Sequence, residues 1–256
     1  MIYLTGDIHG PDSIGKLSRH RWGQASSLTR DDIVIILGDF GLVWSNPPTR
    51  EELWWLRWLD RYPATIAFVD GNHENHDMLD ALATSTWNGG RVHQVSDNVF
   101  HLMRGEVFDL PCDGRTVRAL SFGGAESHDK AWRKEGVSWW AREEASQGEF
   151  ERACANLDAH QWQVDVVLTH DCPSICKGSV ADTPSVPYGA SPYARQGMWR
   201  TTTTNGFLDQ IERQLDFRMW YFGHHHTDTV CEDARHVCLY RQIVEIGNIP
   251  DKKARP

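Results

Sequence analysis

The sequence has no long apolar run, and no basic segment followed by an apolar one at its start. A membrane-spanning helix needs about 20 apolar residues in succession, and a secretory leader needs a basic segment before its apolar core. We therefore expect no insertion into a membrane. The first apolar run begins at Met1 and leaves no room for a removable signal, so the expected location is the cytoplasm.

A disulfide framework is also missing. The six cysteines are scattered and include no C-x-x-C pair: Cys112, Cys154, Cys172, Cys176, Cys231 and Cys238. This pattern favours reduced thiols in a cytosolic protein. Cys172 and Cys176 follow a candidate metal-binding histidine, but a zinc ion would need two more sulfur or nitrogen ligands there. We therefore expect no zinc site at this pair.

Basic residues are scarce: 26 lysines and arginines face 35 acidic residues, which gives a net charge of −9 at pH 7. We therefore expect no general nucleic-acid-binding surface. A local basic pocket for a small phosphorylated substrate remains compatible with this balance. At 256 residues the chain is long enough to bury a substantial core.

Apolar runs and helical periodicity predict the elements of secondary structure. Buried strands are expected at 1–4, 33–37, 65–69, 164–168 and 219–222, and a last strand at 238–246. Helices are expected around 14–19 and over 49–60, 143–157 and 207–215. Between them, residues 95–125 alternate like strands, with a hairpin turn at 112–115.

Polar residues that can bind metal follow the first strand. Asp7 and His9 come directly after it, between Gly6 and Gly10. In extended backbone, side chains two positions apart point the same way, so the carboxylate and the imidazole can meet at one point. Oxygen and nitrogen ligands together suit a borderline divalent metal.

The same pattern returns at later strand ends. Asp39 follows the run 33–37 and Gly38. Asn72 and His73 follow the run 65–69, with Gly71 directly before Asn72. The loops at the carboxyl ends of parallel strands gather at one edge of a sheet. The sequence therefore predicts a metal site at that edge.

Five blocks, taken together, resemble the calcineurin-like metallophosphoesterase superfamily. In order they are Asp7-x-His9, Gly38-Asp39, Gly71-Asn72-His73-Glu74, His170 and Gly223-His224-x-His226. The resemblance implies an α/β fold, a four-layer α+β sandwich in which two mixed β-sheets pack face to face between helices. It also implies a single domain over 1–256, with a long loop at about 173–205 on the active-site side.

The resemblance further implies a centre of two divalent metal ions. Asp7, His9 and His226 would bind the first ion, Asn72, His170 and His224 the second, and Asp39 would bridge them. Nitrogen and oxygen ligands of this kind suit Mn, Fe or Zn better than Mg or Ca. The sequence leaves the choice among the three open.

The activity implied is hydrolysis of phosphomonoesters or phosphodiesters. A hydroxide bridging the metals would attack phosphorus, and His73 would act as general acid or as a donor that stabilises the transition state. One alternative is a nucleotide-specific phosphohydrolase for cyclic nucleotides, dinucleoside polyphosphates or nucleic-acid ends, with Trp139 and Trp140 as a base-stacking wall. A non-catalytic scaffold is less expected, because all seven ligand positions are filled.

One departure from the family pattern matters. The protein-phosphatase branch continues its second block with an Asp and an Arg, where this sequence has Leu42 and Val43. This argues against a phosphoprotein phosphatase. In place of that Asp, either Glu74 or Asp77 would have to orient His73, or no residue does so.

A phosphate-binding cation must then come from elsewhere. Arg133 is the preferred candidate and Lys130 a weaker one, although either is equally consistent with a solvated charge on a polar loop. His225, the middle histidine of the last block, has no role in the pattern. It is expected behind the ligands or at the surface.

Overall fold

Three of the expected apolar runs form the parallel centre of the first sheet. The computed structural model describes residues 1–181 and 201–246. In it, β1 (Ile2–Thr5), β2 (Ile33–Leu37) and β3 (Thr65–Val69) lie side by side and parallel. Every residue of β1 and β2 is buried, as expected for strands covered on both faces.

Four further strands complete this sheet within the described chain, in the order β13-β1-β2-β3-β6-β5-β4. β13 (Ile243–Glu245) pairs antiparallel with β1, and β6 (Val99–Leu102) pairs parallel with β3. β5 (Gly90–Ser96) and β4 (Thr84–Trp87) follow as antiparallel strands at the far edge.

The second sheet has the order β11-β12-β10-β9-β8-β7 over the same described ranges. β7 (Glu106–Cys112) and β8 (Arg115–Phe122) form the expected hairpin, and both of its turn residues, Asp113 and Gly114, have positive φ. β9 (Val166–Thr169), β10 (Met219–Phe222) and β12 (His236–Cys238) run parallel to β8, and β11 (Thr229–Val230) closes the edge.

The two sheets pack face to face. Ile35 and Leu37 of β2 share one buried cluster with Phe108 of β7 and Leu168 of β9. The alternate β2 side chains, such as Ile36, point away from that cluster into a second one beneath the first helix. A strand whose two faces are both buried carries apolar residues at every position, and this is the pattern seen in the sequence.

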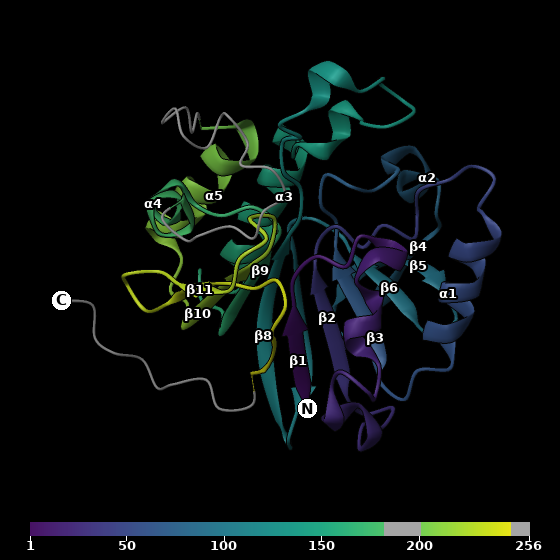
Figure 1. Ribbon diagram of the computed structural model, residues 1–256. Helices are drawn as coiled ribbons and strands as arrows, with labels where there is room; N and C mark the ends of the chain where they lie inside the picture. Colours follow the sequence, from purple (N-terminus) through teal and green to yellow (C-terminus); the bar gives the residue numbers. More distant parts are fainter. Residues whose placement is uncertain (182–200, 247–256) are drawn as a thin grey trace.

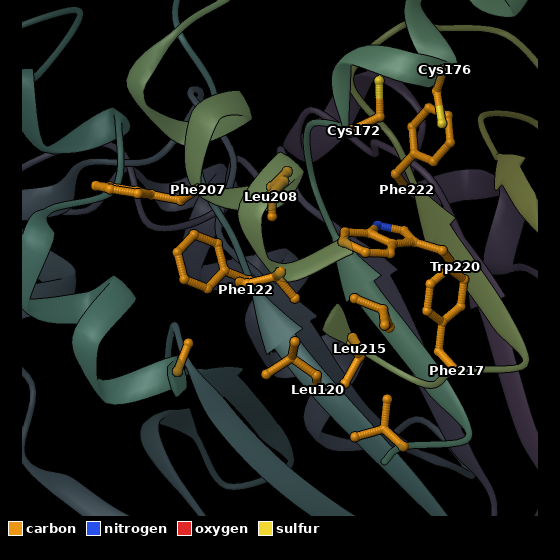
Figure 2. Packing of buried hydrophobic residues seen from close by; sticks show 14 of the residues in the cluster. Leu120, Phe122, Cys172, Cys176, Phe207, Leu208, Leu215, Phe217, Trp220 and Phe222 are labelled. Carbon is orange, nitrogen blue, oxygen red and sulfur yellow. The ribbon is translucent and has the colours of Figure 1, made fainter. Parts of the chain in front are cut away.

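Helices flank the sandwich on both sides (Figure 1). α1 (Arg50–Asp60) and α2 (His76–Asp80) cover the first sheet, whereas α3 (Gln147–Ala159), α4 (Lys177–Ala181) and α5 (Thr203–Gln214) lie on the side of the second. Short 3-10 helices occur at Gly10–Asp12, Ile14–Leu17, Gly23–Ser26, Lys130–Trp132, Ala141–Glu143 and Ser174–Cys176. Figure 2 shows how Leu208 of α5 and Leu215, the residue that follows this helix, pack on Phe122 and Trp220 of the second sheet.

The predicted fold of two mixed sheets between helices is confirmed, but some of the expected elements differ from those observed. The helix expected near 14–19 is a short 3-10 helix, and α3 starts only at Gln147, because Ser146 caps it. The strand expected at 238–246 divides into β12 and β13, which belong to different sheets.

The stretch 173–205, which the sequence predicts to be a long irregular loop, is partly helical where it is described. It contains a 3-10 helix and α4, and α5 begins within it at Thr203. Its residues 182–200 lie outside the described part. Over 1–181 and 201–246, no helix combines the length and the apolar character that crossing a bilayer requires.

Candidate metal centre

The carboxyl ends of five parallel strands bring the predicted ligands together. Four of the seven, Asp7, His9, Asp39 and His226, each offer a ligand atom within 4.8 Å of the other three. They come from the loops after β1, β2 and β10. The ligand atoms of these four residues therefore converge, but they do so between the two sheets rather than at the edge of one, because β10 belongs to the second sheet.

The distances in this group are those of ligands facing a common point. The Nε2 atoms of His9 and His226 lie 2.9 Å apart, and His226 Nε2 lies 3.0 Å from Asp7 Oδ2. His9 Nε2 is 3.6 Å from Asp39 Oδ2. Asp7 Oδ2 is buried and makes no geometrically acceptable hydrogen bond to any described residue. Oxygen and nitrogen lone pairs that converge in this way fit a divalent cation.

His170 supports the same interpretation for a second position. Its Nδ1 lies 2.7 Å from the carbonyl oxygen of Leu37, which can only accept, so Nδ1 carries the hydrogen. Its Nε2 then faces two oxygens, Asn72 Oδ1 at 3.2 Å and Asp39 Oδ1 at 3.2 Å. A positive charge belongs between these three atoms.

The acid–base equilibrium of His170 reflects that charge. Burial opposes a charged imidazole, but the adjacent Asp39 carboxylate, together with Asp7, raises the pKa of His170 to about 10. The same two carboxylates that favour a proton on His170 would favour a bound cation. The residues at this second position therefore also fit a bound metal.

His224 lies beside His170, with the ring centroids 4.9 Å apart. Its backbone amide donates to Asp7 Oδ1 at 3.0 Å. Burial holds the pKa of His224 well below its usual value, so the ring is neutral, as a metal ligand must be. Its ring nitrogens do not belong to the four-residue group around Asp7.

Of the nine non-glycine residues with positive φ in the described part of the chain, four are predicted ligands. They are His9 with φ of 45°, Asp39 with 49°, His224 with 65° and His226 with 51°. Residues other than glycine enter this region at a cost of about 1–3 kcal/mol each, and such strain clusters at functional sites. The chain therefore accepts strain in order to aim these side chains at one point.

Two glycines allow the loops to approach closely. A Cβ on Gly38, which has φ +89°, would lie 2.0 Å from His170 Nδ1. A Cβ on Gly71 would lie 2.2 Å from Asp39 Oδ1. Neither position can carry a side chain without moving a predicted ligand.

His73 lies at the edge of this centre, next to Arg133. Its backbone amide donates to Asp39 Oδ1 at 2.9 Å, and its ring lies edge-on against His9 with centroids 5.0 Å apart. Its Nε2 is 3.3 Å from Nη2 of Arg133. The teal segment that holds Arg133, between β8 and α3, rises above the ends of the strands in Figure 1.

Glu74 and Asp77, the two carboxylates predicted to orient His73, form hydrogen bonds with other groups instead. Glu74 accepts hydrogen bonds from the backbone amides of Phe40 and Gly71, and Asp77 accepts one from the indole of Trp140. Both cations predicted from the sequence are paired with a carboxylate, Lys130 with Glu126 and Arg133 with Asp129 at 2.7 Å. Arg133 is the one that also lies against His73.

The sequence model of the family described as calcineurin-like phosphoesterase matches residues 1–228. This chain belongs to the calcineurin-like phosphoesterase family. Among curated proteins, none matches the sequence.

The solved structures that match this chain are distant from it in sequence. A Staphylococcus aureus protein named a 5′-nucleotidase has 16% identity and a TM-score of 0.43, over 94% of this chain and 49% of its own. The phosphopantetheinyl hydrolase of Mycobacterium tuberculosis has 15% identity and a TM-score of 0.42, over 93% and 89%. The Thermus thermophilus sulfate thiohydrolase SoxB has 11% identity and a TM-score of 0.37, over 94% and 51%. The chain spans about half the length of the first and the third.

Sequence reasoning missed the residues that orient Asn72 in this phosphoesterase. The Asn72 side-chain amide donates to Ser127 Oγ at 3.1 Å, and Ser127 Oγ donates to Glu143 Oε2 at 2.7 Å. This chain of hydrogen bonds turns the Asn72 oxygen toward His170. No motif marks Ser127 or Glu143, since only the fold brings them together.

The aromatic surroundings also differ from expectation. Trp140, proposed as part of a base-stacking wall, is only 4% exposed. The residue beside His73 is instead Trp44, whose ring is nearly parallel to the imidazole at a centroid distance of 6.2 Å. On the other side of the centre, Tyr240 stacks on His226 at 4.7 Å.

Proposed function

We propose that this phosphoesterase is a metal-dependent hydrolase of phosphate monoesters or diesters. Asp7, His9 and His226 would bind one divalent ion, and Asn72, His170 and His224 a second, with Asp39 between them. The observation that carries the proposal is the orientation of Asp39. Its Oδ2 faces His9 at 3.6 Å, whereas its Oδ1 faces His170 at 3.2 Å. One carboxylate thus reaches both sets of ligands.

Two ions held in this way would supply positive charge to polarise the phosphoryl group and would lower the pKa of a water molecule between them. The nitrogen and oxygen donors suit Mn, Fe or Zn. Four neutral imidazoles keep the negative charge of the ligand set low, so that a phosphate is not repelled.

Arg133 and His73 supply the remaining chemistry in this proposal. The Arg133 guanidinium can bind two phosphoryl oxygens at once. His73, positioned by the hydrogen bond from its backbone amide to Asp39, would donate a proton to the departing oxygen. Because Arg133 Nη2 lies 3.3 Å from His73 Nε2, both groups would face the same phosphate.

Substitution of Asp39 tests the proposal. With bis(p-nitrophenyl) phosphate and p-nitrophenyl phosphate in Mn²⁺, Asp39→Asn should lower kcat/KM by at least about 10³-fold, since metal charge stabilises the transition state by several kcal/mol. Asp109→Asn is the matched control, because Asp109 is an exposed residue paired with Arg118. Full activity of folded Asp39→Asn protein would sink the site assignment.

A nucleotide substrate is the second candidate, and Trp44 is the observation that favours it. The ring of Trp44 is part-exposed beside His73, and Trp140 packs edge-on against it at a centroid distance of 5.4 Å. A supported indole at this place can stack on a base, which contributes about 1–3 kcal/mol. Trp44→Ala should then raise KM for nucleotides but not for glycerol phosphate.

We also infer that the enzyme acts in the cytoplasm on a small phosphorylated substrate. None of the six cysteines forms a disulfide, which agrees with a reducing compartment. Retention of all six as thiols in protein isolated under non-reducing conditions tests this location.

A non-catalytic scaffold on this fold is disfavoured, because all seven ligand positions carry competent side chains.

A further inference from the structure

A second group of metal-competent side chains lies behind the strand ends. It consists of Asp171 and Cys172, which follow β9, and His225, which precedes β11. One ligand atom of each lies within 4.8 Å of the other two. None of the three is among the seven ligands of the proposed dinuclear centre.

The distances within this group match those around a zinc ion. His225 Nε2 lies 3.4 Å from Cys172 Sγ and 3.4 Å from Asp171 Oδ1. Around tetrahedral zinc, with Zn–S of about 2.3 Å and Zn–N or Zn–O of about 2.0–2.2 Å, neighbouring ligand atoms are roughly 3.3–3.6 Å apart. The imidazole is therefore at the right separation from both partners.

The carboxylate of Asp171 is held in a fixed orientation. Its Oδ1 accepts from the backbone amide of Cys172 at 2.8 Å, and its Oδ2 accepts from Asn205 Nδ2 at 2.6 Å. Asn205 and Cys172 are fully buried, and Asp171 is 4% exposed. Hydrogen bonds of this kind orient the carboxylates that bind metal ions in proteins.

Cys176 lies beside this group but is not one of its members. Its thiol interacts with the thiols of both Cys172 and Cys231. Figure 2 shows both cysteine side chains close to Phe222 at the end of β10. The sequence alone placed Cys172 and Cys176 four positions apart but lacked two further ligands. The fold supplies one nitrogen ligand, His225, from more than 50 positions away, and an oxygen ligand, Asp171, which the sequence analysis did not consider.

We propose that Asp171, Cys172 and His225 bind a zinc ion. Sulfur ligands select zinc over manganese, whereas the proposed dinuclear centre contains only nitrogen and oxygen ligands. The two sites would therefore differ in the metal they prefer.

The role of this ion follows from the place of His225 in the chain. His225 stands between His224 and His226, two predicted ligands whose φ angles are positive. Fixing the middle residue of this strained turn holds both neighbours in place. The zinc ion is therefore structural, and it supports the dinuclear centre without taking part in the reaction.

Cobalt binding provides a direct test. Metal-stripped protein reloaded with Co²⁺ should show a thiolate-to-cobalt charge-transfer band in the near ultraviolet, which ligands without sulfur cannot produce. Cys172→Ser should remove this band and should lower the zinc content of the isolated protein by one equivalent per chain. Cys154→Ser, which alters a part-buried cysteine on α3, is the matched control and should keep both.

The two proposals fail separately. Asp39→Asn, which disrupts the dinuclear centre, should keep the cobalt–thiolate band if the zinc site exists. Absence of the band from the unaltered protein would overturn the zinc proposal, and that measurement needs no variant to fold. Persistence of the band and of the zinc content in Cys172→Ser would overturn it as well.

Discussion

Glu74, in the loop after β3, accepts a hydrogen bond from Phe40, in the loop after β2, and so joins two loops that carry predicted metal ligands. Glu74 Oε1 accepts from the Phe40 amide at 2.5 Å, and its Oε2 accepts from the Gly71 amide at 2.7 Å. Phe40 directly follows Asp39, and Gly71 directly precedes Asn72. One fully buried carboxylate thus sets the spacing between the bridging aspartate and the asparagine.

Glu74→Ala should destabilise the protein by about 2–6 kcal/mol, because it leaves two buried amides without an acceptor at about 1–3 kcal/mol each. Glu74→Gln keeps the shape and one acceptor oxygen and should lose less. The free energy of unfolding in urea measures both effects. Glu51→Ala, on the exposed face of α1, serves as the control. Equal stability of the Glu74→Ala and Glu51→Ala proteins would contradict this role for Glu74.

Gly71→Ala should weaken metal binding. The new methyl group would lie 2.2 Å from Asp39 Oδ1, 2.5 Å from the Asp39 backbone nitrogen and 2.7 Å from His170 Nε2, so the loop that carries Asp39 must move. Loss of a group that orients a metal ligand typically costs about 10–100-fold in metal affinity, so a loss of at least this size is expected. Titration with Mn²⁺ followed by calorimetry measures the loss. In Gly148→Ala, where a Cβ meets nothing within 4 Å, the affinity should be unchanged.

Arg133→Gln should lower kcat/KM by about 10–100-fold, since a hydrogen bond to a charged group contributes about 1.5–3 kcal/mol. Metal content should stay the same, because Arg133 contacts His73 rather than a predicted metal ligand. Arg152→Gln, on the exposed side of α3, is the matched control. Should the Arg133 and Arg152 variants be equally active, the guanidinium is only a solvated charge on its loop.

The convergence of Asp7, His9 and Asp39 could be predicted from the strand pattern, because the carboxyl ends of neighbouring parallel strands meet at one edge of a sheet. That argument needs no knowledge of side-chain packing. His226 follows β10 of the second sheet, so its place in the group was expected only from the resemblance to the family.

Contacts that depend on irregular segments could not be predicted in the same way. Arg133 reaches His73 across 60 positions from a stretch without periodicity. His225 was hidden between two stronger candidates, and only the fold sets it against Cys172. The last strand was misjudged because residues 243–245 pair with β1, at the opposite end of the chain.

His76 is a buried histidine outside the proposed centre, and it should make stability depend on pH. Its ring is 3% exposed, and burial lowers the pKa of His76 to about 4 from an ordinary 6.5. Four ionisable groups face it: Asp70, Arg104, Arg142 and His101. Burial and the arginine charges outweigh the opposite pull of Asp70, whose carboxylate lies 3.9 Å away.

The unfolded chain takes up a proton at His76 near pH 6.5, whereas the folded protein resists until about pH 4. The stability that neutral His76 contributes is therefore present above pH 6.5 and is lost as the pH falls toward 4. Between pH 7.5 and 5, the unaltered protein should lose about 2 kcal/mol more than His76→Gln, which cannot titrate. Urea unfolding of both proteins, stripped of metal at each pH, measures this difference. Parallel pH profiles would mean that the folded protein binds a proton at His76 as readily as the unfolded chain does.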